Sequence, residues 1–294
     1  MSGAPEVSVV IPAYYSDATI ASCLEALERQ TFRDFEVIVV DSTPNDRTPT
    51  ILRDRFPAVS LIRSAERLLP HAARNRGAAA ARGRILAFTD PDCRAHSDWL
   101  ELLVAAHREG HEAVGGAIEA QERGMAAAVH VVKFAWWLPG GRPGPHRDLP
   151  TANASYARVL WDDVGPFLET RFAGDTEMGW RIMASGRTLW YEPRAIVTHT
   201  REPGGRALYR ERYLRGRDFG LTRVDRQRWS RARCLVYLAA APLLPFVMTA
   251  RAARYALGCG HALTWLITSP TQLVANGAWC VGEARSHWEA VWRS

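Results

Sequence analysis

Lysine is almost missing from this chain of 294 residues, because only Lys133 among its 37 basic side chains is not arginine. The five cysteines form no C-x-x-C pair, so the sequence gives no sign of a zinc site or a redox dithiol. Scattered thiols of this kind are typical of a reducing compartment. No basic residue precedes the first apolar run, so we expect no secretory signal.

Two nucleotide-binding signatures are also missing. No G-x-G-x-x-G follows the first apolar run, which ends in Pro12-Ala-Tyr14, and no Walker-type P-loop occurs in the sequence. The chain therefore lacks the glycine-rich cradles that hold dinucleotides and nucleoside triphosphates. Its composition, 47% hydrophobic and 23% charged, is ordinary for a globular protein and excludes a mainly disordered chain.

The positive charge is concentrated in one segment. Residues 201–233 contain eleven arginines and four acidic residues, a net charge of +7, although the whole chain carries only +6. Such a segment is typical of proteins that bind phosphate groups, nucleic acid or acidic lipid head groups, and a solvated helix face is the simpler alternative. We expect no nucleic-acid partner, because the segment adjoins apolar runs and has no recognisable nucleic-acid-binding motif.

Two long uncharged runs follow the arginines. Residues 234–250 and 255–282 contain no Asp, Glu, Lys or Arg, and tryptophans lie near the ends of the second run. Basic residues before such runs favour attachment of residues 234–294 to the cytoplasmic face of the cell membrane. A buried helical hairpin that covers the preceding domain is the alternative.

The first 200 residues alternate between apolar strands and helices. Four strands are predicted, at residues 7–11, 36–40, 60–62 and 85–89. Asp17 and Asp98 are expected to cap two of the helices between and after them. Nearly continuous apolar strands that alternate with helices are typical of a mostly parallel sheet with helices on both faces. We therefore expect a Rossmann-like α/β domain over residues 1–200, an arginine-rich connection over 201–233 and an apolar helical appendage over 234–294.

Polar residues follow three of these strands directly. Pro12 and Tyr14 end the first strand, Asp41 ends the second, and Asp90 and Asp92 flank a proline after the fourth. Ligands of such sheets bind beyond the carboxyl ends of the strands, so these groups are expected to share one crevice. Two carboxylates at this spacing suit Mg²⁺ or Mn²⁺ with substrate phosphates as further ligands, and an ordinary turn is the alternative.

A second group of candidate residues lies on a helix that begins near Asp175. Asp175 shares one helical face with the residues three, four, seven and eight positions later, namely Met178, Gly179, Ile182 and Met183. A carboxylate at a helix N-terminus is stabilised by the helix dipole, so Asp175 is a candidate general base, with a plain helix cap as the alternative. Glu177 lies on another face, four residues before Arg181, and predicts a surface ion pair.

Several ordered motifs resemble glycosyltransferase family 2. They include Val-Ile-Pro-Ala-Tyr at residues 10–14 and Phe-Thr-Asp-Pro-Asp at 88–92. The remaining matching stretches are residues 23–30, 35–41, 73–77, 81–87, 151–155, 164–167 and 175–186. The resemblance covers roughly residues 5 to 200. It implies a GT-A fold, a nucleotide-sugar donor, a divalent cation (Mn or Mg) and, as is usual in the family, an inverting transfer.

The resemblance also implies roles for individual residues on the donor side. Pro12 and Tyr14 would line the pocket of the nucleotide base, and Asp41 would contact the base or the ribose. Arg74 matches a position near the donor, and Asp90 would face the ribose or the metal. Arginines between 201 and 233 would reach the diphosphate, because family members often close this region over the donor.

The metal and the base are assigned in the same way. Asp92 would ligate the metal, and His199 would be a further metal or phosphate contact, with a structural histidine as the alternative. Asp175 matches the aspartate of the Glu-Asp motif that supplies the catalytic base. The chain departs from the family pattern at three positions: Gly174 replaces the glutamate of that motif, Tyr15 stands where asparagine is common, and Ser42 replaces the second of two aspartates.

The leading hypothesis is a metal-dependent inverting glycosyltransferase at the cytoplasmic face of the membrane, with a lipid-linked saccharide, a lipid or a polymer end as acceptor. Trp136 and Trp137, followed by a Gly/Pro-rich stretch, are candidates for an acceptor-side loop, and core packing is the alternative. A nucleotidylyltransferase is disfavoured, because it needs a glycine-rich basic loop after the first strand. A nucleotide-sugar or carbohydrate-binding membrane protein without catalysis is the non-enzymatic alternative, and Gly174 is its best support.

Overall fold

The structure is a computed structural model that describes residues 3–121, 125–200, 205–260 and 262–292. The chain forms two compact units. The sheet unit comprises the residues up to Glu119 together with Arg142–Thr170 and Gly174–Thr200. The helical unit comprises Ala120–Gly141, Arg171–Ala173 and the chain beyond Thr200. The division at residues 200 and 233 that the sequence predicts stays a prediction, and residues 201–204 lie outside the described residues.

One nine-stranded sheet organises the sheet unit within the described residues. Its strands are β1 (Val7–Ala13), β2 (Phe35–Asp41), β3 (Ser60–Arg63), β4 (Ile85–Thr89), β5 (Cys93–Ala95), β6 (Ala113–Ala120), β7 (Gly144–His146), β8 (Asn153–Ala157) and β9 (Leu189–His199). The order is β3-β2-β1-β4-β8-β6-β9-β5, and β7 pairs with β9. The four strands predicted from sequence form the parallel part, β3-β2-β1-β4. Strand β8 then pairs antiparallel with both β4 and β6, so the whole sheet is mixed.

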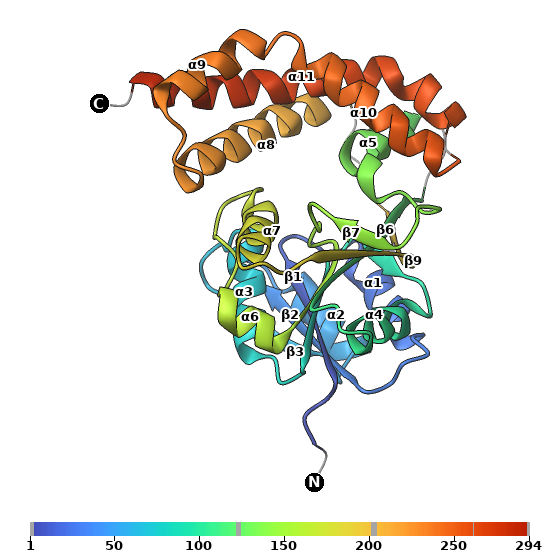
Figure 1. The fold of residues 1–294 in the computed structure, drawn as a ribbon. Helices are drawn as coiled ribbons and strands as arrows, with labels where there is room; N and C mark the ends of the chain where they lie inside the picture. Colours follow the sequence, from blue (N-terminus) through green and yellow to red (C-terminus); the bar gives the residue numbers. More distant parts are fainter. Residues whose placement is uncertain (1–2, 122–124, 201–204, 261, 293–294) are drawn as a thin grey trace. The chain divides into compact units, whose positions relative to one another are not determined.

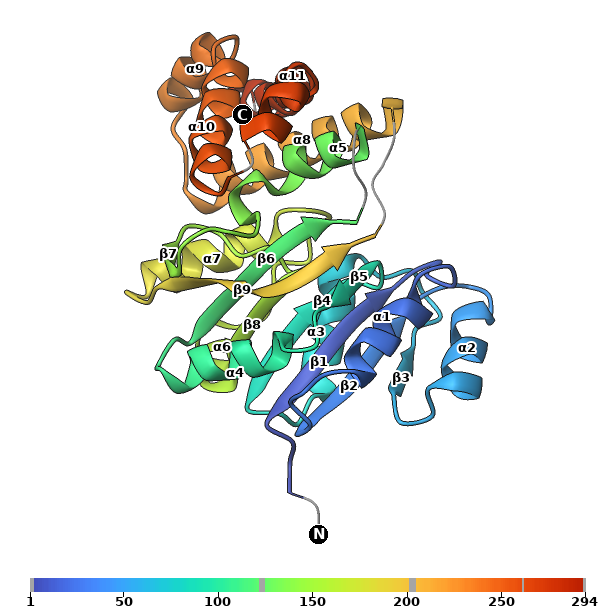
Figure 2. The ribbon, with the colours of Figure 1, turned by 90° about the vertical axis from the view of Figure 1, so that its right-hand side faces the viewer.

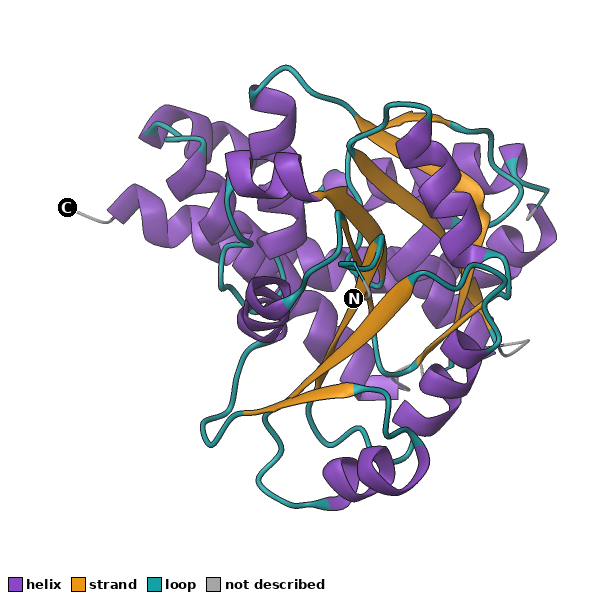
Figure 3. Ribbon diagram, turned by 90° about the horizontal axis from the view of Figure 1, so that it is seen from below, coloured by secondary structure: helices purple, strands orange, loops and turns teal. Residues whose placement is uncertain are grey.

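Helices cover both faces of this sheet, as the sequence predicts (Figures 2 and 3). They are α1 (Ile20–Glu28), α2 (Arg47–Arg55), α3 (Pro70–Ala80), α4 (Trp99–Arg108), α6 (Arg158–Val164) and α7 (Gly174–Ala184). The predicted caps are wrong in detail. Helix α1 begins after Thr19 rather than at Asp17, and Asp98 precedes α4 but its side chain makes no capping hydrogen bond. Glu101 instead accepts a hydrogen bond of 2.7 Å from the hydroxyl of Thr31.

Aromatic packing fills the space between the sheet and helices α6 and α7. The ring of Phe88 stacks on Trp161 at 5.4 Å and meets Phe167 edge-on at 5.2 Å. Met178 and Ile182 of α7 are fully buried in the same core cluster. Each such side chain contributes about 1.5–3 kcal/mol by leaving water. This packing fixes the N-terminal turn of α7, where the candidate base lies, relative to the end of β4.

The helical unit is built from α5 (Met125–Phe134), a 3₁₀ turn (Ala135–Trp137), α8 (Gly205–Arg226), α9 (Arg231–Ala240), α10 (Leu244–Gly258) and α11 (Ala262–Trp292) (Figure 1). Helices α8 and α11 approach each other backbone to backbone. A Cβ at Gly216 would collide with the carbonyl of Trp279, and a Cβ at Gly282 would collide with the carbonyl of Tyr213. Glycine is required at both positions because any side chain would force the helices apart.

No single helix among the described residues is both long and apolar enough to cross a membrane. Helices α9 and α10 reach that threshold only as a pair, and they are bent by 74° at the break between them. The second uncharged run of the sequence divides between the end of α10 and α11, which contains Pro270. These observations concern length and composition, so attachment to a membrane stays a prediction.

Candidate active site

The structure brings the polar strand ends together at one edge of the sheet. Strand β1 lies between β2 and β4, with Pro12 opposite Val40 and Ala13 opposite Asp41. Pro12 is buried, whereas Tyr14 is 38% exposed, and the guanidinium of Arg67 lies 4.5 Å from the centre of its ring. Tyr14 therefore presents an aromatic side chain beside a cation at the carboxyl end of the sheet.

Asp41 is fully buried and fixes the loop that follows β1. Its carboxylate accepts hydrogen bonds from the backbone N–H of Thr43 at 3.0 Å and from the hydroxyl of Thr43 at 2.6 Å. Thr43 Oγ1 in turn accepts the backbone N–H of Tyr15, whose φ of 49° lies in the left-handed region. Arg63 approaches the other carboxylate oxygen at 3.7 Å. Asp41 therefore stabilises the loop after β1 through Thr43, and the contact with the donor stays a prediction.

Arg74 and Asp90 form an ion pair. Arg74 is 4% exposed on α3, and its guanidinium donates to the Asp90 carboxylate just beyond β4. A nearly buried guanidinium held in place by a carboxylate keeps its remaining N–H donors in a fixed orientation. This cation lies where the predicted donor site needs positive charge.

Asp92 and His199 meet because β5 pairs antiparallel with β9, which sets Cys93 opposite His199. The distance from His199 Nε2 to Asp92 Oδ2 is 3.6 Å. Candidate ligand atoms of Asp92, Cys93 and His199 all lie within 4.8 Å of one another. Burial, and the charges of Asp92 and Asp90, raise the pKa of the Cys93 thiol well above its ordinary value. Sulfur is a soft ligand, whereas Mg²⁺ and Mn²⁺ favour oxygen and nitrogen, so Asp92 and His199 are the better ligands for a hard divalent cation.

Asp175 lies in the first turn of α7 and is half-buried. One carboxylate oxygen accepts the backbone N–H of Thr176 at 2.9 Å, and the other accepts the N–H of Thr151 at 3.4 Å. Gly174, just before it, has no room for a side chain. A Cβ there would lie 2.6 Å from Cδ2 of His71 and would collide with the carbonyl of Leu168. The space that the glutamate of the family motif would need is therefore filled.

Two expectations about α7 are wrong. Glu177 is not on the surface but 3% exposed, and Met183 is not buried but 38% exposed. The predicted ion pair does form, with Arg181 Nε 2.9 Å from Glu177 Oε2. Arg181 also donates to the backbone carbonyls of residues 164–166, at the end of α6 and just after it. Helix α7 is thus covered on a second side, a tertiary contact that helical periodicity alone does not reveal.

Asp148 is a carboxylate that the sequence analysis missed. It follows β7, and its Oδ2 accepts a hydrogen bond of 3.0 Å from the hydroxyl of Thr176. Burial, and then the charge of Asp175, raise the pKa of Asp148 to about 7. The same two carboxylates, after burial, raise the pKa of Tyr156 on β8. No motif marks Asp148 in the sequence, because its position depends on a loop that folds back onto α7.

Solved structures with a similar fold include a mannosyltransferase. The mannosyltransferase PcManGT from Pyrobaculum calidifontis, in complex with GDP-Man and Mn²⁺, matches with a TM-score of 0.66 at 21% identity over 98% of this chain and 88% of that chain. TarS of S. aureus matches with a TM-score of 0.56 at 18% identity, over 74% of this chain and 40% of that chain. At these identities the likeness establishes the fold, which is GT-A.

The sequence comparisons establish the family. The family model described as Glycosyl transferase family 2 matches residues 8–155. Glycosyltransferase AglE of Haloferax volcanii is 31% identical over 215 residues, which cover 70% of this chain and 71% of that protein. The probable glycosyltransferase YdaM of Bacillus subtilis is 26% identical over 240 residues, 74% of this chain and 57% of that protein. The chain belongs to glycosyltransferase family 2, as the motifs predict.

Proposed function

We propose that this glycosyltransferase is a metal-dependent inverting enzyme that moves a sugar from a nucleoside-diphosphate donor to a hydroxyl of a lipid-linked or polymeric acceptor. One observation carries the proposal. Thr89, at the end of β4, donates a hydrogen bond of 3.0 Å to the carbonyl of Ala152, and the next residue back, Thr151, donates its N–H to Asp175. Asp90 follows β4, and Asp175 is hydrogen-bonded just before β8. The paired strands β4 and β8 therefore position both the donor-side residue and the candidate base.

Each candidate residue then has a chemical task. Arg74, held by Asp90, supplies a fixed cation for the donor diphosphate. Asp92 and His199 would hold the divalent cation, which neutralises charge on the leaving diphosphate when it is bound. Asp175 accepts the proton of the acceptor hydroxyl while the oxygen bonds to the anomeric carbon and the bond from that carbon to the diphosphate oxygen breaks. A single displacement of this kind inverts the configuration at the anomeric carbon.

Two solved structures of the same fold support the cation and the donor class. PcManGT was solved with GDP-Man and Mn²⁺, and GalNAc-T7 with UDP, GalNAc and Mn²⁺. The latter matches with a TM-score of 0.55 at 15% identity, over 69% of this chain and 44% of that chain. In this chain Asp92 and His199 fit the cation, and Arg74, which pairs with Asp90, fits the diphosphate.

The helical unit supports a proposal about location, namely attachment to the cytoplasmic face of a membrane. Beside small apolar clusters inside, this unit has many large apolar side chains on its surface and many polar ones in its interior. Large apolar side chains are at least 51% exposed at Leu235, Val236, Leu243, Phe246, Leu257, Leu263, Leu266, Ile267, Val274, Val281, Trp288 and Trp292. Polar side chains are buried at Arg212, Thr222, Thr268, Gln272, Asn276, Glu283, Ser286 and His287. We call the first group the exposed apolar set; surfaces of this kind mark interaction sites.

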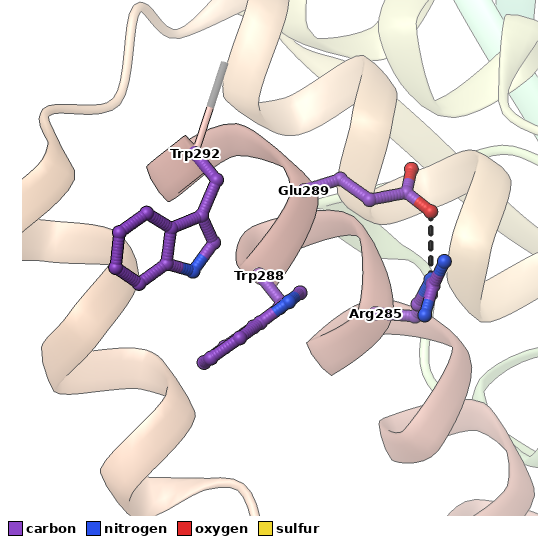
Figure 4. A pocket seen from close by; sticks show the side chains of 4 residues that line it. All are labelled: Arg285, Trp288, Glu289 and Trp292. Carbon is purple, nitrogen blue, oxygen red and sulfur yellow. Dashed lines mark hydrogen bonds and ion pairs between the residues drawn. The ribbon is translucent and has the colours of Figure 1, made fainter. Parts of the chain in front are cut away.

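The last turns of α11 add tryptophans and charges to this surface. Arg285, Trp288, Glu289 and Trp292 line an open pocket of about 520 Å³ (Figure 4). The two indole rings lie 5.6 Å apart, and Arg285 donates to Glu289 at 2.7 Å. Indoles beside charged groups are typical of the interface between lipid and water. Residues 201–294 carry fifteen arginines and six acidic residues, a net charge of +9, which favours an anionic lipid surface.

A donor panel tests the proposed function. Purified protein is incubated with GDP-mannose, UDP-glucose and UDP-N-acetylgalactosamine, each with octyl glucoside as acceptor and with or without Mn²⁺, and release of nucleoside diphosphate is measured. The proposal predicts that at least one donor is turned over and that Mn²⁺ is required. Turnover that is equal with EDTA would contradict the metal dependence. Binding of a donor without any release would favour the non-catalytic binding protein.

A further inference from the structure

Two carboxylates meet at the N-terminal turn of α7. Asp175 belongs to that turn, Asp148 comes from the loop after β7, and Thr176 links them. Thr176 gives its backbone N–H to Asp175 and its hydroxyl to Asp148, at 2.9 and 3.0 Å. Asp148 lies along the same face of the helix as Asp175, because a Cβ added at Gly179, four residues after Asp175, would be 4.0 Å from Asp148 Oδ1. Asp148 therefore lies at contact distance from the helix, on the side that carries Asp175.

We propose that Asp148 is a positioning residue for the candidate base: through Thr176 it fixes the orientation of Asp175, and its negative charge makes Asp175 a stronger base. The inference rests on the proposed function, since it assumes that Asp175 accepts the proton of the acceptor. Asp148 touches neither substrate in this account and acts only through Asp175.

The electrostatics of the site agree with this geometry. Burial and the neighbouring Asp175 raise the pKa of Asp148 to about 7, so Asp148 is mostly protonated below that pH and mostly ionised above it. Below pH 7 Asp175 therefore has a neutral neighbour. Above pH 7 the negative charge of Asp148 increases the proton affinity of Asp175.

Other ionisable groups lie around the pair. They are Tyr156 on β8, Arg74 and His71 on α3, Glu177 and Arg181 on α7, and His146 and Arg147 ahead of Asp148. Tyr156 stays neutral between pH 6 and 8.5, because burial raises its pKa. Contributions from the histidines and from the substrates cancel when two proteins that differ only at residue 148 are compared as a ratio.

The experiment measures kcat and KM from pH 6 to 8.5 for the intact protein and for Asp148→Asn. The readout is Mn²⁺-dependent hydrolysis of the most active of GDP-mannose, UDP-glucose and UDP-N-acetylgalactosamine, with water in the place of the acceptor. Asparagine mimics the protonated carboxyl and still accepts from Thr176, so at pH 6 the two proteins should agree within about twofold. At pH 8.5 the kcat of the variant should be about tenfold lower. Without the charge of Asp148, Asp175 is a weaker base, and general base catalysis slows as the base weakens. Donor KM should stay unchanged.

Two further variants keep the test decisive. Thr176→Val removes the bridging hydroxyl, whose hydrogen bond lowers the pKa of Asp148, so the rate gain at alkaline pH should begin at a higher pH, whereas Thr176→Ser restores the profile. Asp163→Asn, an exposed carboxylate paired with Arg187, is the control for the loss of one charge. A ratio of kcat values that is constant across pH, or a loss confined to KM, would overturn the proposal. Asp175→Asn distinguishes a failure of the proposed function from a failure of this inference. If that variant keeps full turnover, the assignment of Asp175 as the base is wrong. If it loses turnover while Asp148→Asn shows no pH effect, only the role of Asp148 is wrong.

Discussion

The two units of this protein differ in where their large apolar side chains lie. In the sheet unit the core is built on Phe88, Met178 and Ile182, which are fully buried, although Arg74 and Glu177 are buried as well. In the helical unit Glu283 is 2% exposed and accepts from the hydroxyl of Tyr237 at 2.7 Å, while Phe246 is 60% exposed. The first pattern is that of a soluble enzyme domain. The second pattern suits helices whose outer surface faces something other than water.

We propose that the sheet unit carries the chemistry and the helical unit the attachment, and each proposal can be tested separately. The largest effect is expected for Asp175→Asn. The amide keeps the size of the side chain and a hydrogen-bonding oxygen but cannot accept a proton, so transfer should fall by about 10²-fold or more. Donor binding should be nearly unchanged, and a variant that keeps more than half of the wild-type kcat would contradict the assignment.

A smaller effect is expected when the exposed apolar set is made polar. The triple variant Phe246→Ser, Leu266→Ser, Ile267→Ser removes three side chains that are 60–64% exposed. Each buried side chain of this size contributes about 1.5–3 kcal/mol, so flotation with vesicles that contain phosphatidylglycerol should drop by about tenfold or more. Hydrolysis of a soluble donor should persist. The matched control is Val159→Ser, on α6 of the sheet unit and 72% exposed, which should not alter flotation.

The smallest effect is expected for Glu177→Gln, which weakens a buried contact without touching the chemistry. Arg181 would keep its bonds to the carbonyls after α6 but lose its charged partner, which costs about 1–3 kcal/mol of unfolding free energy. The melting temperature should therefore fall while kcat stays close to that of the intact protein. A collapse of kcat without loss of stability would mean that Glu177, and not Asp175, is the base.

The parallel half of the sheet could be predicted because its strands are continuous apolar runs. Strands β5 and β7 could not, since each has three residues and exists only by pairing with β9. Asp90, Asp92 and Asp175 stood out because motifs mark them. Asp148 and Cys93 carry no such mark, and their place depends on tertiary contacts. The burial of Glu177 was missed for the same reason, because a helical pattern indicates one inward face and not the second that α6 covers.

Catalysis in the sheet unit depends above all on the divalent cation that we propose Asp92 and His199 hold for the donor diphosphate. This proposal is tested most directly by calorimetric titration of GDP and UDP into the intact protein, Asp92→Asn and Asp54→Asn, with Mn²⁺ and with EDTA. Asp54 is an exposed carboxylate far along the chain from the predicted site and serves as the control. The account predicts that Mn²⁺ tightens nucleotide binding by about tenfold or more in the intact protein and in the control, and that Asp92→Asn abolishes this gain, because a metal site that loses a ligand binds far more weakly. Equal affinity with Mn²⁺ and with EDTA in the intact protein, or an undiminished gain in Asp92→Asn, would contradict it.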